Sequence, residues 1–306
     1  MMKCEICNSE NVKFLYKLRD RLYNIDNKMF NLFGCKSCGL LFINPKPSEK
    51  ELSKYYPENY ISKISKKDPR NNLIDLLYRT YFEKGRLPLK ILFLPVKNLL
   101  RFLPKQGRVL DVGCGDGKFL RYCKNNGLEV SGVDLYIEKP IPELNIKKSD
   151  LLSTKFPNKS FDCITLNNVI EHVQNPEEIL RECKRILKDN GRLVLNFPSP
   201  SSFNYRVFGK DWVSMDTPRH LFLFSIKSIK LLLKRNNMKI TKISNKAEAF
   251  SLIGSYIYKK GGDDLDKSKI LSNSLINIAL MPLAMILNAL GLGDSKEIII
   301  KKEFIS

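Results

Sequence analysis

One nine-residue segment at positions 109–117 constrains this chain most strongly. It reads VLDVGCGDG, an apolar strand pattern that runs into a turn with three glycines. Residues 118–126 then follow a helical pattern, which Gly127 ends. A strand, a glycine-rich turn and a helix in this order typically open an α/β sheet. We therefore expect a parallel sheet with helices on its faces.

The chain continues this pattern after the glycine-rich turn. Short apolar runs, which predict strands, alternate with segments of helical periodicity. We expect strands at 108–112, 129–134, 145–149, 161–166, 192–197, 238–244 and 297–302, and helices at 118–126, 176–188 and 225–236, the second ended by Asn190 and Gly191. This order predicts an α/β fold with a Rossmann-like, seven-stranded sheet.

Acidic side chains stand where the first two predicted strands end. Asp111 lies at the tip of one strand, and Asp134 closes the next. The GxGxG spacing departs from the GxGxxG of dinucleotide sites, and Asp111 would repel a pyrophosphate but attract an ammonium or sulfonium. These features favour S-adenosylmethionine, which carries both cations, with Asp134 accepting hydrogen bonds from its ribose.

Further cofactor contacts are expected along the same edge of the sheet. Gly113 and Gly115 let the backbone approach the ligand closely. Asp150 and Leu151 follow the third strand and would hold the adenine, and Asn167 follows the fourth. The predicted cofactor-binding residues are Asp111, Gly113, Gly115, Asp134, Asp150, Leu151 and Asn167.

Four of the eight cysteines form two CxxC pairs near the start of the chain, Cys4 with Cys7 and Cys35 with Cys38. Two such pairs supply the four thiolates of a tetrahedral, structural zinc site; a redox dithiol is the alternative. Residues 1–5 show no apolar run typical of a secretory signal, so we expect a reducing, cytoplasmic setting. The other four cysteines, Cys114, Cys123, Cys163 and Cys183, are expected in the core.

The charge is strongly basic and unevenly distributed. The chain has 52 basic and 32 acidic side chains, a net charge of +20. The net charge is +11 over residues 1–105, +1 over 106–200 and +8 over 201–306. Basic flanks could serve nucleic acid, nucleotide-linked sugars or an acidic membrane face, or could follow from a lysine-rich composition alone.

Several segments resemble class I S-adenosylmethionine-dependent methyltransferases. They are VLDVGCGDG, GVD, FDCITLNNVIEHV and GRLVLNFPSP, and the resemblance covers most of residues 1–245. The CxxC pairs and the run from Trp212 to Phe222 are similar to zinc-ribbon members found in small-molecule and surface-glycan biosynthesis. The resemblance implies methyl transfer from S-adenosylmethionine to a small molecule or glycan precursor, and we expect oxygen as the methylated atom.

A hydroxyl acceptor needs a base, and the chain has only two histidines. His172 follows the fourth strand and His220 follows the fifth, so both are candidate general bases. For each, the alternative is a structural histidine bonded to a backbone carbonyl. Arg219 could clamp a phosphate or carboxylate of the substrate. We expect the substrate pocket between segment 46–105 and loop 200–220, over the carboxyl edge of the sheet.

The predicted organisation has three parts: a zinc-ribbon module at 1–45, a helical connector or substrate lid at 46–105, and a methyltransferase domain at 106–306 with a helical insertion at about 247–294. Residues 275–292 are apolar enough for a marginal membrane span. Pro282 and a narrow stripe of asparagines argue against spanning. We expect packing on the domain or in a homodimer, or peripheral contact with a membrane surface.

Two other functions are alternatives to small-molecule methylation. A zinc module and a basic chain fit a methyltransferase that acts on a base of rRNA or tRNA. No Asn-Pro-Pro-Tyr-like motif follows the fourth strand, where residues 167–170 read NNVI, and this speaks against that class. The second alternative is a non-catalytic zinc-ribbon binding protein. The intact acidic and glycine positions of the cofactor motif speak against it.

Overall fold

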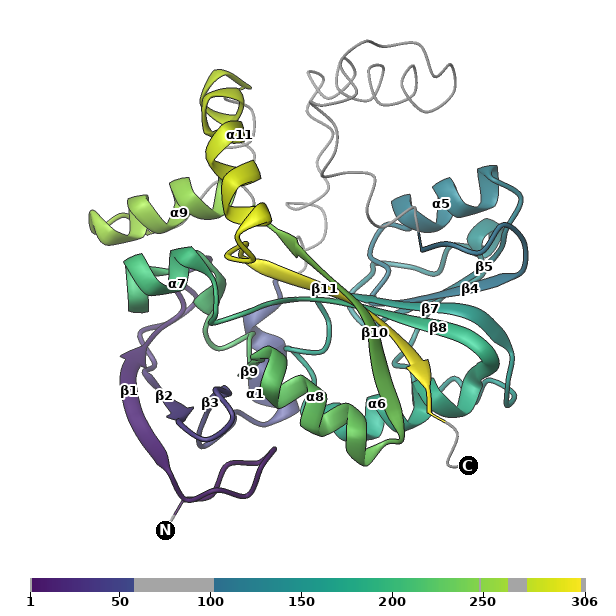
Figure 1. Ribbon diagram of the computed structural model, residues 1–306, viewed down its shortest axis with the longest axis horizontal. Helices are drawn as coiled ribbons and strands as arrows, with labels where there is room; N and C mark the ends of the chain where they lie inside the picture. The colour runs from purple at the N-terminus through teal and green to yellow at the C-terminus, as the bar shows by residue number, and fades with distance from the viewer. Residues whose placement is uncertain (1, 58–101, 248, 264–273, 304–306) are drawn as a thin grey trace.

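The computed structural model describes residues 2–57, 102–247, 249–263 and 274–303 (Figure 1). These residues form two sheets. The large sheet has seven strands in the order β10-β11-β8-β7-β4-β5-β6, and the small sheet has four in the order β1-β2-β3-β9. The large sheet is the Rossmann-like sheet that the sequence predicts, so the fold class is confirmed.

Five neighbouring strands of the large sheet run parallel, and one strand beside them runs the other way. β11 is antiparallel to both β10 and β8. Successive strands lie on opposite sides of β4, because β5 and β6 follow on one side and β7 on the other. Ligands of open α/β sheets bind at such a switch point. The strands are β4 (Arg108–Val112), β5 (Glu129–Asp134), β6 (Ile146–Lys148), β7 (Phe161–Asn167), β8 (Leu187–Pro198), β10 (Met238–Lys246) and β11 (Ser295–Lys302).

Helices cover both faces of this sheet. α5 (Lys118–Asn125) lies on one face, and α6 (Pro176–Ile186) and α8 (Ile226–Arg235) lie on the other (Figure 1). The Asn175 side chain caps the start of α6 by accepting from the backbone N–H of Glu178. A short 3₁₀ turn, η2 (Pro142–Leu144), stands between β5 and β6 in place of a crossover helix.

One predicted boundary is wrong. Helix α6 ends at Ile186, and Asn190 and Gly191 lie inside strand β8 instead of ending the helix. Leu187 already has extended backbone angles and pairs with Phe161 of β7. The register then shifts, because the next pair joins Cys163 to Arg192. Strand pairing therefore outweighs the local turn signal of the Asn-Gly pair.

The small sheet joins the N-terminal region to the loop that follows β8. It consists of β1 (Val12–Leu18), β2 (Phe30–Cys35), β3 (Leu41–Ile43) and β9 (Phe222–Leu223). Strand β9 belongs to the loop after β8, so this sheet takes a strand from beyond the predicted 1–45 module. Leu40 and Phe42 of the N-terminal region also share one buried cluster with Leu195 of the large sheet. The two sheets therefore pack on a common core.

The predicted connector is described only at its start, by α1 (Glu49–Leu52) and η1 (Ser53–Tyr55); residues 58–101 lie outside the described residues. The loop between β8 and β9 forms α7 (Phe203–Phe208), η3 (Gly209–Asp211) and η4 (Val213–Met215). These short helices place the residues around position 216 against the small sheet, because Trp212 and Met215 pack with Leu18 and Leu223.

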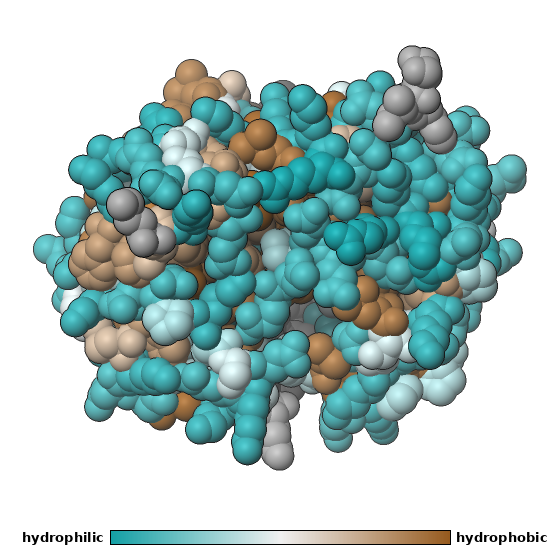
Figure 2. Space-filling view, turned by 90° about the horizontal axis from the view of Figure 1, so that it is seen from below, coloured by the Kyte–Doolittle hydropathy of each residue, from teal (hydrophilic) through white to brown (hydrophobic). Residues whose placement is uncertain are grey.

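Two helices, α9 (Ala249–Lys259) and α11 (Ser274–Ala289), separate β10 from β11 where an insertion is predicted. Leu287 of α11 is buried, but Ile286 is 56% exposed and Leu290 65%. No helix among the described residues is long and apolar enough to cross a membrane. Another face of the molecule is mostly hydrophilic, with separate hydrophobic patches (Figure 2).

Candidate functional site

The glycine-rich turn lies between β4 and α5, at the switch point of the sheet. Gly113 has a φ of +71°, and a Cβ there would stand 2.4 Å from Cγ2 of Val169. Its N–H donates to the carbonyl oxygen of Val133 over 2.8 Å, which holds the turn against β5. A Cβ on Gly115 would meet no protein atom within 4 Å. The turn therefore leaves open space on the side of Gly115.

The carboxylate of Asp134 is fixed at the end of β5, beside this turn. Its Oδ2 accepts from the N–H of Gly115 over 2.9 Å, and its Oδ1 accepts from the N–H of Tyr136 over 2.7 Å. Each carboxylate oxygen has a second lone pair for another donor. Asp134 is thus oriented by the backbone and keeps accepting capacity toward a ligand.

Asp111 is buried in β4 between the neighbouring parallel strands. Its Oδ1 accepts from the hydroxyl of Thr165 over 2.5 Å. The pKa of Asp111 is raised to about 7, because burial and the nearby charge of Asp134 outweigh the Thr165 hydrogen bond, which lowers it. A buried carboxyl under this desolvation penalty gains most from a cationic partner. The position therefore suits an ammonium or sulfonium.

The remaining predicted cofactor residues have different settings. Asp150 accepts two hydrogen bonds from Ser153, which together outweigh burial and lower its pKa. Leu151 is buried in the main core cluster. Asn167 is exposed at the end of β7, and its Oδ1 accepts from Asn196 over 2.7 Å.

His172 lies just after β7 and joins the predicted connector to the sheet. Its Nδ1 is 2.9 Å from the hydroxyl of Tyr56 and 3.1 Å from the carbonyl oxygen of Arg219. The ring of Tyr56 stacks on Tyr136, with 4.0 Å between the ring centroids. Burial and, to a smaller extent, the charge of His220 lower the pKa of His172 to about 3, so the imidazole is neutral near pH 7.

His220 faces His172, with 4.6 Å between the ring centroids and the planes at 76°. Its Nδ1 is 2.8 Å from the carbonyl oxygen of Ser214, which can only accept, so Nδ1 carries the proton. Its Nε2 is 3.8 Å from Oδ2 of Asp216. The contact with Ser214 therefore fixes the tautomer whose Nε2 has the lone pair, as a general base requires.

Arg219 does not stand at the surface of the predicted pocket. Its side chain is completely buried and forms ion pairs with Asp20 and Asp216, at 2.6 and 2.7 Å. Another of its N–H groups donates to the carbonyl oxygen of Tyr55 over 3.0 Å. These partners use the guanidinium to join three chain segments, so we do not retain Arg219 as a substrate clamp.

The four N-terminal cysteines meet as predicted. The Sγ atoms of Cys4 and Cys38 are 3.6 Å apart, and those of Cys7 and Cys35 are 3.5 Å apart. All four Sγ atoms lie within 4.8 Å of one another. Sulfur atoms about 2.3 Å from one ion, at tetrahedral corners, have spacings of this size. The cluster is therefore compatible with a zinc ribbon, and the other four cysteines are buried as expected.

Several residues of the site were missed in the sequence. Tyr56 belongs to the YYPENY segment, whose tyrosines gave no specific signal for a contact with a histidine. Asp20 accepts from three backbone N–H groups and from Arg219, 199 positions away. Glu171 is completely buried beside His172, and its place in the EHV sequence gave no signal for this. These contacts depend on the tertiary fold.

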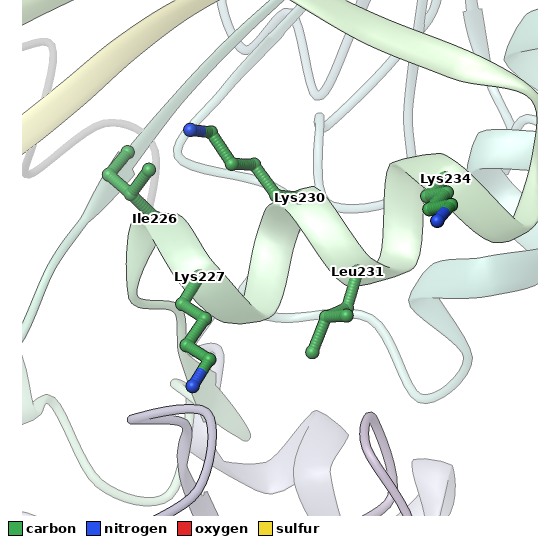
Figure 3. A pocket seen from close by; sticks show the side chains of 5 residues that line it. All are labelled: Ile226, Lys227, Lys230, Leu231 and Lys234. Atoms are coloured by element: carbon green, nitrogen blue, oxygen red, sulfur yellow. The ribbon is translucent and has the colours of Figure 1, made fainter.

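A surface hollow of about 330 Å³ lies on α8, away from these groups (Figure 3). Three lysines, Lys227, Lys230 and Lys234, line it with Ile226 and Leu231. No acidic or histidine side chain lines this hollow, and we assign it no part in the site.

Comparison with known proteins gives two kinds of relative. Over 130 aligned residues, the chain is 32% identical to a ubiquinone biosynthesis O-methyltransferase of Dechloromonas aromatica, covering 37% of this chain and 54% of that protein. A protein of the same name from Xanthomonas axonopodis pv. citri is 31% identical over 134 residues, covering 39% and 55%. The chain spans about half the length of these curated relatives.

Among solved structures, the [4+2]-cyclase SpnF matches with a TM-score of 0.51 and 16% identity, covering 85% of this chain and 98% of that one. A methyltransferase from Archaeoglobus fulgidus matches with a TM-score of 0.47 and 23% identity, covering 74% and 99%. The match to SpnF supports the fold alone.

A family model described as a methyltransferase domain matches residues 85–243, slightly more than half of the chain. The matched range contains the glycine-rich turn, Asp111, Asp134 and both histidines. The chain therefore belongs to the methyltransferase-domain family.

Proposed function

We propose that this protein transfers a methyl group from S-adenosylmethionine to an oxygen atom of a small-molecule or glycan-precursor acceptor. The observation that carries the proposal is the pair of carboxylates at the switch point. Asp111 is buried with the hydroxyl of Thr165 as its hydrogen-bond donor, and Asp134 is oriented by the N–H groups of Gly115 and Tyr136.

These residues fit S-adenosylmethionine in charge and in space. Asp111 would balance the positive methionyl end, and Asp134 would accept from the ribose hydroxyls. The open side of Gly115 leaves room for the ligand beside the backbone. We place Asp150, the backbone of Leu151 and Asn167 along the adenine side. When bound, the cofactor supplies an electrophilic methyl group.

Oxygen as the acceptor atom is supported by the named relatives and by His220. The ubiquinone biosynthesis O-methyltransferases that match this chain act, by name, at oxygen. We propose that Nε2 of His220 takes the proton of the acceptor hydroxyl, because the Ser214 carbonyl holds the ring in the matching tautomer. His172 is the weaker candidate, since burial lowers its pKa to about 3, and we give it a structural role beside Tyr56.

Zinc bound by Cys4, Cys7, Cys35 and Cys38 completes the proposal as a structural ion. Four protein thiolates leave no position open for a substrate. We also propose that the protein works in the cytoplasm, where such thiols stay reduced. The exposed apolar side chains of α11 suit either a second copy of the chain or a membrane surface. Light scattering and co-sedimentation with anionic vesicles test these two partners.

The cofactor site is tested by calorimetry. We expect the purified protein to bind S-adenosylmethionine, and Asp134→Ala to weaken binding by about 1–3 kcal/mol, the cost of a lost hydrogen bond to a charged group. Glu129→Ala is a matched control at the other, exposed end of strand β5. Equal affinities of the Asp134 variant and the wild type would contradict the ribose contact.

The reaction is tested by supplying labelled S-adenosylmethionine with cell extract separated into small molecules, glycan precursors and RNA. We expect label in one of the first two fractions and none with Asp111→Asn. Label in RNA alone would favour the base-methyltransferase alternative. Binding of the cofactor without transfer to any fraction would favour a non-catalytic protein.

A further inference from the structure

Glu171 is a buried carboxyl group for which the described residues supply no hydrogen-bond partner. The residue has no exposed surface, and both Oε1 and Oε2 are without a donor in the described part of the protein. The N–H groups of Leu221 and Phe222 donate to its backbone oxygen and not to its side chain. Buried carboxylates are normally paired with a cation or coordinate a metal. The ionised form of this carboxyl group therefore requires a positive partner.

Two imidazoles stand beside this carboxyl group. One ligand atom from each of Glu171, His172 and His220 lies within 4.8 Å of the other two. The contact between Nδ1 of His220 and the carbonyl oxygen of Ser214 directs the lone pair to Nε2. The carbonyl oxygen of Arg219 can do the same for His172, by accepting from Nδ1 over 3.1 Å. Metal-binding histidines typically use their second nitrogen in this way.

We propose that Glu171, His172 and His220 form a binding site for one divalent transition-metal ion, separate from the four cysteines. Two imidazole nitrogens and one carboxylate oxygen suit ions of the zinc, cobalt and iron class better than magnesium or calcium. Three protein ligands also leave coordination positions open. A bound ion would stand about 2 Å from each of these three ligand atoms.

The ion and the acceptor proton compete for the same lone pair of His220. Occupancy of the site therefore excludes the base role that the proposed function gives to His220. The proposal itself concerns binding, and its test needs no methyl transfer. Loss of catalytic activity and loss of metal binding are thus distinguishable results.

The test uses the full chain with zinc already in the cysteine cluster, titrated with Co²⁺ by calorimetry and visible absorption. We expect one further equivalent of Co²⁺, with ligand-field bands but no thiolate charge-transfer band. Glu171→Gln keeps the size of the side chain and should weaken Co²⁺ binding at least about tenfold, the effect seen even for residues that only orient ligands. Glu178→Gln, an exposed position on α6, is the matched control and should bind as the wild type does.

His220→Asn provides a second variant if Glu171→Gln does not fold, and it should also lose the added Co²⁺. Thermal unfolding of each variant shows that a loss of binding is not a loss of structure. No binding of Co²⁺ beyond the cysteine cluster would overturn the proposal. Unchanged affinity in a folded Glu171→Gln or His220→Asn variant would do the same.

Discussion

The proposed site has two sides that are built in different ways. The cofactor side is the edge of the large sheet around the glycine-rich turn, and the acceptor side is the region around His220. On the cofactor side, Asp111, Asp134 and Asp150 each stand at or near the end of a strand of one parallel sheet, within 40 positions of one another. On the acceptor side, Asp20 and Arg219 meet across 199 positions of the chain. Local sequence specifies the first arrangement, whereas buried polar contacts between distant segments specify the second.

The acceptor side is also in direct contact with the N-terminal cysteine region, whereas no such contact is described for the cofactor side. β3 pairs with β9, which matches Phe42 with Phe222, only two residues after His220. The hydroxyl of Ser225 donates to the carbonyl oxygen of Cys38 over 2.5 Å. A change at the cysteine cluster should therefore reach the acceptor side before it reaches β4 and β5.

The largest effect is expected from breaking the cysteine cluster with Cys35→Ser. Structural zinc contributes on the order of 10 kcal/mol of binding free energy in zinc-finger peptides, and removing one of four thiolates weakens this binding. We expect the four-stranded sheet to unfold locally, while β4 and β5 remain folded. Hydrogen exchange would show fast exchange over β1–β3 and β9 only.

Cys183→Ala is the control for that variant, because Cys183 is a buried thiol of α6 outside the cluster. It should leave exchange in the small sheet unchanged. Uniform loss of protection across both sheets after Cys35→Ser would contradict the claim that the cysteine cluster stabilises the acceptor side more than it stabilises β4 and β5.

A smaller loss of stability is expected from Asp20→Asn. The change removes one of the two carboxylates that hold the buried guanidinium of Arg219. Breaking a buried ion pair costs about 3–5 kcal/mol, and we expect the lower end because Asp216 remains. Urea unfolding measures the free energy of unfolding, and S-adenosylmethionine affinity should stay close to wild type.

Glu10→Gln is a matched control for Asp20→Asn. Glu10 pairs with Lys3 at the surface, with side-chain exposures of 52% and 64%, so its loss should cost less than about 0.5 kcal/mol. A similar small cost for both variants would contradict the importance of the buried pairs.

This difference also explains what the sequence could predict. The glycine-rich turn fixed the positions of Asp111 and Asp134, because strand ends and backbone turns follow from nearby residues. Strand β9 has only two residues and pairs with β3, 180 positions earlier. No local sequence pattern could therefore predict it. For the same reason Arg219 looked like an exposed substrate ligand, although Asp20 and Asp216 bury it.

His220→Asn tests the acceptor side by its chemistry. The amide can still donate to the carbonyl oxygen of Ser214, but it cannot accept a proton, so we expect turnover to fall about 10²–10⁴-fold. S-adenosylmethionine affinity should not change. The assays are run with a chelator selective for weakly bound ions, which separates the base role from metal occupancy. Full turnover in this variant would remove His220 from the mechanism.

The smallest effect is a pH dependence on the cofactor side, and it comes from Asp111. The pKa of this carboxyl is about 7 in the folded protein, against an ordinary value of 3.8, so the folded state binds more protons between these values. By linkage, the contribution of Asp111 to stability falls as pH rises from about 4 to 7 and is level above that. A bound cation would favour the ionised form and lower this pKa.

Binding of S-adenosylmethionine should therefore release a proton and strengthen with pH up to about 7. One ionisation permits at most a tenfold gain in affinity per pH unit. The cofactor ammonium stays charged in this range, since α-amino groups have pKa values of about 7.7–8.0.

Calorimetry at pH 5.5, 6.25 and 7.0, in buffers of different ionisation enthalpy, measures both the affinity and the number of protons released on binding. Asp111→Asn should bind more weakly and without this slope. Equal affinity of the wild type at pH 5.5 and 7.0 would show that Asp111 does not face the cationic end of the cofactor, and the cofactor side would then need another source of selectivity.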